Sequence, residues 1–271
     1  MRYRIVLKYD GAPFCGWQIQ PSDPSVQQTL EQALSTLLGV QTPVTGAGRT
    51  DTGVNASSYV AHFDTEAPVA DCADLRYRLN AILPEAVAVE AVEPAPAEFH
   101  ARFDATRREY LYFLHRRKDP FVGRYSYLYT YPGLDFEKMN RAAEALLGRH
   151  DFSCFEKTGT DTRTSVCTVF DARWERYTPD LQILSGAETH SEDYWVFRIA
   201  ADRFLRNMVR AVVGTLLEIG RGKRSPESLA EIVGPVLAEG ENGSPVPASR
   251  RPLAGESVPG HALFLSRVEY D

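Results

Sequence analysis

The chain has 271 residues, of which 44% are hydrophobic and 24% are charged, which is typical of a globular protein with one large or two small domains. No apolar run approaches the ~20 residues of a membrane-spanning helix, and the N-terminus lacks the apolar core of a signal peptide, so we expect a cytoplasmic protein. The four cysteines are scattered without a Cys-x-x-Cys pair, which indicates reduced thiols and neither a disulfide framework nor a metal site.

The net charge of -6 is unevenly distributed along the chain. Residues 64–98 hold eight acids and two arginines, whereas residues 102–124 hold seven bases against three acids and residues 203–224 hold six bases against one acid. A localised positive field can bind a polyanion whatever the total charge is. The two basic windows therefore predict contact with nucleic acid, although solvated surface arginines would give the same pattern.

Along the first hundred residues, the pattern predicts strands and amphipathic helices in alternation. Ser25 and Gln28 have the spacing of a capping box, so we expect a helix that begins after Ser25 and ends at Gly39. The other expected elements are strands at 2–9, 57–63 and 86–92, a helix at 71–83, and a proline-rich connector at 93–98.

The rest of the chain predicts a strand in the second half of residues 99–113 and a mixture of strands and helices after it. We expect helices at 135–147 (closed by Gly148), 204–219 and 225–233, strands at 166–174, 181–184, 194–199 and 262–270, and a loop at 240–260. Gly214 would let another backbone approach its helix closely. The order of elements favours an α+β fold, with helices on one face of a largely antiparallel mixed sheet.

Residues 46–56 place three glycines around one arginine and one aspartate, Asp51. A dinucleotide fingerprint that starts at Gly46 would need glycine at position 51, and a phosphate loop that starts at Gly48 would need Lys and Ser/Thr where Val54 and Asn55 stand. Both nucleotide-binding motifs are excluded. The loop is then either a structural turn with an Asx-type hydrogen bond or a loop that presents the Asp51 carboxylate to a ligand.

Arg203, Arg206 and Arg210 would share one face of the mostly apolar helix at 204–219. A buried guanidinium needs a carboxylate or phosphate partner, and Asp51 is a plausible one. Such a partner lowers the pKa of an aspartate by ~1–3 units and keeps it fit to act as a nucleophile or base, although an ordinary structural ion pair remains the alternative. Tyr110 offers an aromatic face for a nucleobase, or is a packed strand tyrosine.

The segment Gly46–Val54 resembles the signature of the tRNA pseudouridine synthase A family. Five further segments resemble motifs of that family in the family's order: Tyr9–Gln18, Phe99–Phe103 with Arg108 and Tyr110, His150–Phe152 with Phe155, Phe204–Arg210 with Gly214–Leu216, and Leu263–Tyr270. The resemblance therefore covers the whole chain, and six motifs in order make it specific.

The resemblance implies a pseudouridine-synthase-like fold, with two similar halves around a central cleft. We place the halves at 1–104, which carries the aspartate loop, and 105–271, which carries Tyr110 and the arginine helix. It further implies a tRNA pseudouridine(38-40) synthase, an isomerase that converts uridine to pseudouridine in the anticodon arm. The family acts as a homodimer on tRNA and needs no cofactor and no metal.

The resemblance also implies roles for single residues. Asp51 would be the catalytic nucleophile and Arg210 would pair with its carboxylate. Arg49 would lie beside the extruded base, Tyr110 would stack on the uracil and accept the C5 proton, and Leu263 would line the base pocket. Further contacts with RNA are expected from four other arginines: Arg107, Arg108, Arg203 and Arg206.

Three departures from the family pattern concern the loop and the pocket rim. Asn55 stands where the family usually has His, Thr52 replaces the commoner Ala, and residues 259–262 replace a small-residue turn. Two other functions compete with the isomerase. A non-catalytic RNA-binding protein could share the fold, whereas a glycosidase would need a second carboxylate ~5–9 Å from Asp51, and the nearest acids lie across a strand.

Overall fold

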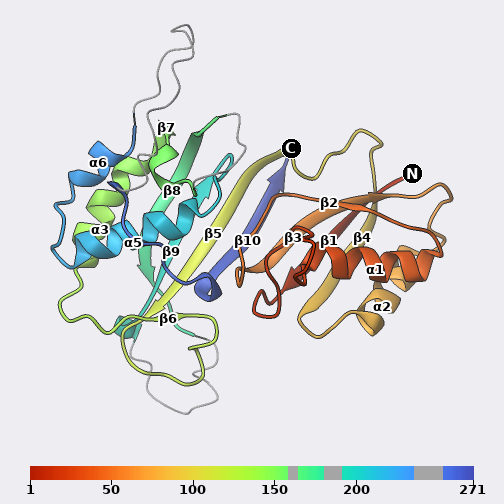
Figure 1. The fold of residues 1–271 in the computed structure, drawn as a ribbon, viewed down its shortest axis with the longest axis horizontal. Helices are drawn as coiled ribbons and strands as arrows, with labels where there is room; N and C mark the ends of the chain where they lie inside the picture. The colour runs from red at the N-terminus through yellow and green to blue at the C-terminus, as the bar shows by residue number, and fades with distance from the viewer. Residues whose placement is uncertain (158–163, 180–190, 235–252) are drawn as a thin grey trace, which may run out of the picture. The chain divides into compact units, whose positions relative to one another are not determined.

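The computed structural model describes residues 1–157, 164–179, 191–234 and 253–271 (Figure 1). Two compact units divide the chain: Met1–Arg108 together with Phe264–Asp271, and Glu109–Leu263. The sequence placed the division between residues 104 and 105. The structure places it four residues later and assigns the end of the chain to the first unit.

The first unit is built on a sheet with the strand order β4-β1-β3-β10, and β2 pairs with β3. The strands are β1 (Arg2–Tyr9), β2 (Val44–Gly46), β3 (Asn55–Asp64), β4 (Val87–Ala95) and β10 (Leu263–Tyr270). The central strand β1 is antiparallel to both of its neighbours, and β10 runs parallel to β3. Alternate residues of β1 are buried, as the period-two pattern of the sequence predicted.

Two helices belong to this unit, α1 (Val26–Leu38) and α2 (Cys72–Ile82), and they lie side by side (Figure 1). The hydroxyl of Ser25 accepts a hydrogen bond from the Gln28 backbone N–H, and Gly39 ends α1 with φ 72°. Both predicted caps are therefore confirmed. A left-handed residue after a helix is most easily provided by glycine, which has no Cβ.

The predicted connector at 93–98 is partly wrong, because β4 continues through Pro94 to Ala95. Pro94 lies opposite Tyr3 of β1. Proline cannot donate a ladder hydrogen bond, but β4 is the edge strand of this unit's sheet and needs no donor on its open side.

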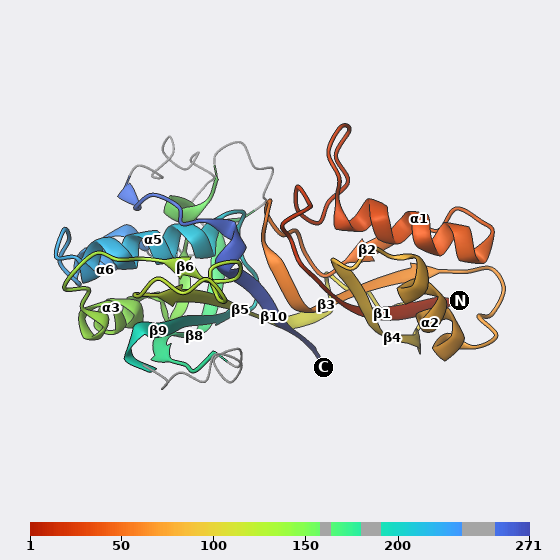
Figure 2. The same cartoon turned by 90° about the horizontal axis from the view of Figure 1, so that it is seen from below.

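The second unit contains a sheet with the order β5-β9-β8-β7, and β6 pairs with β5. The strands are β5 (Ala105–His115, which begins in the first unit), β6 (Tyr127–Leu128), β7 (Gly148–Asp151), β8 (Val166–Arg176) and β9 (Tyr194–Ala201). The helices are α3 (Phe136–Ala143), α5 (Met208–Gly220) and α6 (Ser228–Ile232). These helices lie together on one side of β8 and β9 (Figure 2). Short 3₁₀ turns are η1 (Glu144–Leu146), η2 (Ser153–Phe155), η3 (Ser191–Asp193) and η5 (Gly260–Ala262).

Several boundaries in this unit differ from the prediction. The helix expected at 135–147 ends as an α-helix at Ala143 and continues as η1, and Gly148 opens β7 instead of only closing the helix. The helix expected at 225–233 is shorter, and the strand β6 was not predicted. The strand expected at 181–184 and most of the loop expected at 240–260 lie outside the described residues.

The helix expected at 204–219 begins only at Met208. Asn207 has φ 67°, a left-handed conformation that interrupts a right-handed helix, and its side-chain amide donates to the Ser257 hydroxyl at 2.7 Å. Arg203 and Arg206 therefore precede α5, and the prediction that they share a helix face with Arg210 is wrong.

The predicted close approach at Gly214 is confirmed. A Cβ on this residue would lie 1.7 Å from the backbone oxygen of Glu256. Gly255 approaches the adjacent residue of α5, Thr215, to whose hydroxyl its N–H donates at 2.8 Å. Segment 254–258 thus lies directly on the helix backbone. With its mixed α+β composition and mostly antiparallel pairing, the architecture is the α+β class that the sequence indicated.

We expect Gly214→Ala to lower the free energy of unfolding by about 1–3 kcal/mol, because the methyl group would push the backbone at Glu256 off the helix. Urea unfolding monitored by circular dichroism measures the change. Gly123→Ala is the matched control, since its Cβ would lie 3.5 Å from the nearest atom, the Asp119 oxygen. Equal stabilities of the two variants would contradict the role given to Gly214.

Candidate active site

Asp51 lies on the loop that joins β2 to β3 in the first unit. Its side chain is half-exposed, the preceding Thr50 is buried, and Arg49 is exposed. Asp51 is thus only partly covered by the protein, while the buried residue before it anchors the loop.

Four hydrogen bonds join this loop to the segment at residues 9–17. They are Tyr9 Oη with Thr50 Oγ1 at 2.9 Å, Trp17 N–H to Thr50 O at 3.3 Å, Gly53 N–H to Phe14 O at 3.3 Å, and Gly11 N–H to Asn55 Oδ1 at 2.8 Å. They bracket Asp51 on both sides along the chain. The backbone that carries the carboxylate is therefore fixed from Thr50 to Asn55.

Two glycines of that segment make the contact sterically possible. A Cβ on Gly11 would lie 2.3 Å from the Val54 backbone oxygen, and one on Gly16, whose φ is 93°, would lie 2.3 Å from the Thr50 oxygen. Backbone meets backbone at both points, and only glycine leaves the room.

Beneath the loop, the indole of Trp17 stacks on the ring of Tyr59, with centroids 4.0 Å apart. Both rings are buried, and the Tyr59 hydroxyl donates to the Gly48 carbonyl. A Cβ on Gly46 would collide with both rings. Glycine at position 46 therefore lets the chain pass close to the two stacked rings.

Arg108 supports the loop from another direction within the same unit. Its guanidinium is half-buried and donates to three backbone carbonyls: Ala47 O at 3.1 Å, Ala105 O at 2.7 Å and Arg102 O at 2.5 Å. Its neighbour Arg107 lies 4.0 Å from the Glu269 carboxylate. Arg108 thus ties the start of β5 to the loop that holds Asp51.

The segment Phe99–Phe103 is fixed by histidines. The Ala101 N–H donates to Nδ1 of the buried His62 at 3.1 Å, and the Arg102 and Phe103 N–H groups share Nδ1 of His100. Burial, followed by the positive charge of Arg2, lowers the pKa of His62 to about 4. His62 is therefore neutral at pH 7, as an acceptor at Nδ1 must be.

The other candidate residues belong to the second unit. Tyr110 is half-buried on β5, and its ring meets that of Phe204 edge to face at 5.0 Å. Arg210, on α5, donates from Nε to the Val258 carbonyl at 2.7 Å, and Leu263 is 4% exposed at the start of β10. Arg203 is half-buried and Arg206 is exposed.

Within this unit, Arg210 connects α5 to the segment that leads to Leu263. The Val258 N–H donates back to the Arg210 carbonyl, so the two residues exchange hydrogen bonds. Arg210 also lies near enough to the buried Tyr112 to counteract part of the effect of burial on the pKa of that phenol, which is raised overall. The predicted arginine and the predicted pocket leucine are therefore linked through Val258.

Among the described residues, no group of three or more His, Cys, Asp or Glu side chains is placed to hold a metal ion. In the same part of the chain, no helix has the length and apolar character needed to cross a membrane.

A family model described as tRNA pseudouridine synthase matches residues 5–104 and 142–271. The chain belongs to the tRNA pseudouridine synthase family. It is 45% identical over 270 residues to tRNA pseudouridine synthase A of Parabacteroides distasonis, covering 99% of this chain and 96% of the relative. It is 46% identical to the protein of that name from Bacteroides fragilis, with the same coverages. It is 38% identical to the Bacillus subtilis protein of that name, with full coverage of both chains.

Asn55 is the clearest departure from the tRNA pseudouridine synthase motif, and the structure gives it a function in the loop. It is 1% exposed, and its Oδ1 accepts the Gly11 N–H. An imidazole nitrogen can accept the same bond. The substitution of Asn for the usual His therefore preserves an acceptor at this point.

Sequence reasoning missed the hydrogen bond between Tyr9 and Thr50. The segment Tyr9–Gln18 was recognised as a family motif, but nothing in it shows which loop it contacts. Pairing of β1 with β3 sets that contact, with Tyr9 opposite Ala56. A tyrosine at the very end of a strand and before Asp-Gly is the only signal in the sequence.

Tyr9→Phe should lower the free energy of unfolding by about 1–3 kcal/mol, because it leaves the buried Thr50 hydroxyl without this partner. Amide hydrogen exchange at Trp17 and Gly53 should become faster as the loop loosens. Tyr77→Phe is the matched control, since Tyr77 is 73% exposed. Unchanged exchange at both amides in Tyr9→Phe would show that the hydroxyl does not hold the loop.

The lowered pKa of His62 predicts that the protein loses stability in acid. Its folded pKa of about 4 lies below its unfolded value near 6.5, so the unfolded chain takes up the proton first. The contribution of neutral His62 to the free energy of unfolding is fully present above pH 6.5 and is lost as the pH falls from there to 4. His62→Asn, which keeps an acceptor oxygen, should lose about 1–3 kcal/mol less than the wild type over that range. Parallel stability curves in denaturant titrations would contradict this assignment.

Proposed function

We propose that the chain isomerises uridine to pseudouridine at nucleotides 38, 39 and 40 in the anticodon arm of tRNA, with Asp51 as the nucleophile. The observation that carries the proposal is the fixed loop of Asp51: a half-buried aspartate on a loop held by four hydrogen bonds, in a chain related over its full length to proteins named tRNA pseudouridine synthase A.

The reaction rearranges one nucleoside and consumes nothing else. The N1–C1′ bond breaks, the uracil turns, and C5 bonds to C1′, while C5 loses a proton and N1 gains one. The base must first leave the helical stack, which costs a few kcal/mol. Positioning of the extruded base and of one attacking group is what the protein must supply.

Three routes begin at the Asp51 carboxylate. It attacks C6 of the uracil, attacks C1′ of the ribose, or removes the C2′ proton. All three require an ionised carboxylate with a free lone pair that points at the nucleoside. A loop that cannot bend away favours each of them, because a misplaced nucleophile loses most of its effective concentration.

We assign the uracil to Tyr110, whose ring would stack on the base and whose hydroxyl would accept the C5 proton. Its edge-to-face contact with Phe204 supports this role, since it sets the plane of the ring before substrate arrives. Leu263 would line the base pocket, Arg49 would stand beside the extruded base, and Arg210 would complete the substrate-binding set.

RNA contacts are proposed for Arg107, Arg203 and the exposed Arg206. Arg108, which we also placed in this set, would contribute through the loop, because its guanidinium is engaged by the Ala47, Ala105 and Arg102 carbonyls. We further propose a homodimer that acts on tRNA in the cytoplasm without a cofactor, as the family resemblance implies.

Asp51→Asn and Asp51→Ala should reduce pseudouridine formation in a tRNA transcript by about 1,000-fold or more, since each removes the attacking group, while the affinity for tRNA survives. Nucleoside analysis after carbodiimide labelling measures the product, and filter binding measures affinity. Asp74→Asn, at an exposed position on α2, is the matched control.

If the Asp51→Ala protein still converts uridine, the nucleophile is elsewhere. If the wild type binds tRNA with a strong salt dependence but leaves its nucleosides unchanged, the chain is a non-catalytic RNA-binding protein with this fold.

A further inference from the structure

Residues 116–131 of the second unit, which we call the 116–131 loop, form a closed and ordered loop. Its ends are joined where β6 pairs with the end of β5 and where the Tyr129 N–H donates to the His115 carbonyl at 2.8 Å. Inside, the Arg116 guanidinium donates to the Tyr129 and Tyr131 carbonyls at 3.1 and 2.7 Å. The loop therefore presents a defined surface without first having to become ordered.

Large apolar side chains are exposed on this loop to an unusual degree. Among the described residues, 13 large hydrophobic side chains are exposed, and four of them fall within these 16 residues: Phe121 (62%), Tyr125 (37%), Leu128 (39%) and Tyr131 (41%). Single exposed hydrophobic residues are normal, but a cluster of this kind marks a surface that binds something.

The charge on the loop indicates what it binds. Four bases, Arg116, Arg117, Lys118 and Arg124, stand against one acid, Asp119. That acid is occupied, because its carboxylate accepts from the Tyr194 hydroxyl at 2.6 Å and from the Phe121 N–H at 2.8 Å. Arg117 and Lys118 are exposed and form no ion pair with any residue in the described ranges.

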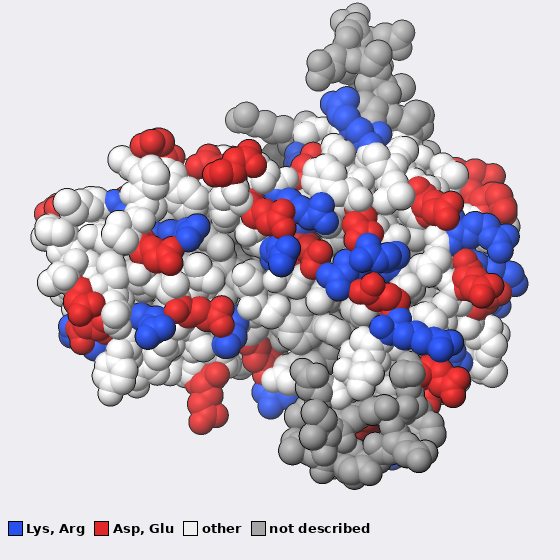
Figure 3. Space-filling model, turned by 180° about the vertical axis from the view of Figure 1, so that it is seen from behind, with Lys and Arg blue, Asp and Glu red and all other residues white. Residues whose placement is uncertain are grey.

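On strands β8 and β9 of this unit, basic side chains are neutralised by neighbouring acids. On β8 and β9, Arg173 contacts Asp171 and Glu175, and Arg198 contacts Glu109 and Glu175. Figure 3 shows basic and acidic side chains interspersed over the face opposite that of Figure 1. The 116–131 loop differs from that pattern and would attract a polyanion.

Aromatic rings and guanidinium groups lie together on this surface. The Arg124 guanidinium lies 5.4 Å from the centroid of the Tyr125 ring, and that of Arg221, at the end of α5, lies 4.2 Å from the Tyr131 ring. Proteins bind single-stranded nucleic acids with neighbouring aromatic rings, which stack on the bases, and guanidinium groups, which contact the phosphates.

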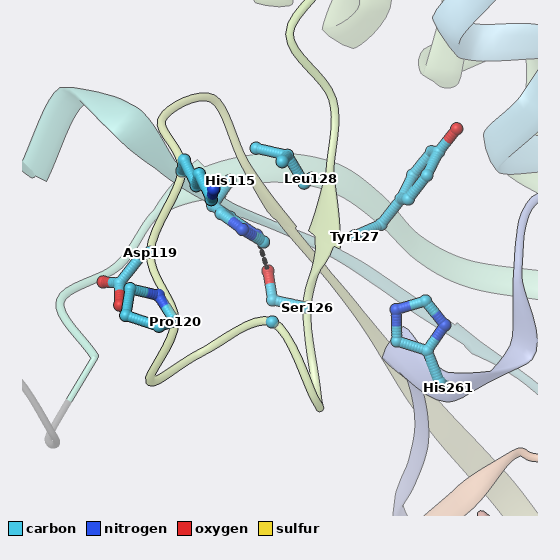
Figure 4. A pocket seen from close by; sticks show the side chains of 9 residues that line it. His115, Asp119, Pro120, Ser126, Tyr127, Leu128 and His261 are labelled. Atoms are coloured by element: carbon cyan, nitrogen blue, oxygen red, sulfur yellow. Dashed lines mark hydrogen bonds between the residues drawn. The ribbon is translucent and has the colours of Figure 1, made fainter.

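Other residues of the 116–131 loop line a hollow of about 370 Å³ (Figure 4). His115 and Ser126, joined at 2.9 Å, form its buried polar floor, while Lys118, Leu128 and His261 contribute to its walls. Its volume is at the lower end of the ~300–1,000 Å³ of small-molecule sites, which suits one nucleobase. His261 stands two residues before Leu263, so the hollow adjoins the segment assigned above to the base pocket.

We propose that the 116–131 loop is an additional RNA-binding surface, which holds an unpaired stretch of the substrate tRNA. Arg117, Lys118 and Arg124 contact phosphates, Phe121 and Tyr125 stack on bases, and the hollow admits one base. The inference rests on the proposed function for the identity of the RNA. It does not follow from the family model, since residues 105–141 lie between its two matched segments.

The test compares two double variants of the full chain, Arg117→Ala/Lys118→Ala and Phe121→Ala/Tyr125→Ala. The charge variant should weaken tRNA binding and reduce the slope of log Kd against log salt by about 1–2, since each phosphate contact contributes ~0.7–0.9. The aromatic variant should weaken binding by about 10-fold or more with the slope unchanged, as expected for lost stacking. Single-turnover rates at saturating tRNA should stay close to the wild-type value in both.

Helix α2 provides matched controls, because it exposes the same types of side chain: Arg76→Ala/Arg78→Ala for charge and Tyr77→Ala for the aromatic group. These variants should bind tRNA as the wild type does. Thermal unfolding of every variant identifies any that is destabilised.

Wild-type affinity and salt slope in both loop variants would overturn the inference, and pseudouridine formation by the wild type would then leave the proposed function intact. A smaller oligomer mass of the loop variants in sedimentation would also overturn it, because the loop would then be an interface between copies of the chain. If the wild type binds tRNA without modifying it while the loop variants bind more weakly, the surface is supported and the proposed function fails.

Discussion

The contact between residues 9–17 and the Asp51 loop is the constraint on which the site depends. A glycine-rich loop has many accessible conformations, so glycines alone would leave the carboxylate loosely placed. Two glycines of the neighbouring segment, Gly11 and Gly16, counteract this freedom, because they let the two backbones come into contact and form hydrogen bonds. Catalytic groups must be held to within about 0.5 Å, and this requires supporting hydrogen bonds of the kind that hold the loop here.

The sequence predicted those parts of the fold that local chemistry determines. Helix α1 has its own caps in Ser25 and Gly39, and β1 has its own alternation, so both were placed correctly. The start of α5 was not, because the left-handed turn at Asn207 is held by Ser257, 50 residues away along the chain. Likewise, Pro94 is permitted in β4 only because that strand has no neighbour on its outer side within its unit.

The candidate site shows the same division. Asp51 could be singled out from its loop, since glycine spacing excluded phosphate binding and left the carboxylate. The partners that fix the loop could not be predicted from the sequence. The strand register brings Tyr9 to Thr50, and Arg108 donates hydrogen bonds to three backbone carbonyls that are not apparent from the sequence. Position 55 is explained by its chemistry: it requires a buried acceptor for the Gly11 N–H, and both Asn and His provide one.

The stack of Trp17 on Tyr59 has an optical consequence. The chain has three tryptophans, and this one lies buried directly beneath the loop that carries Asp51. Its emission depends on how closely the loop shields the indole from water, whereas Trp174 and Trp195 belong to the other unit. The protein thus carries a natural fluorophore beside the loop that holds Asp51, and tryptophan emission could report any opening of that loop in real time.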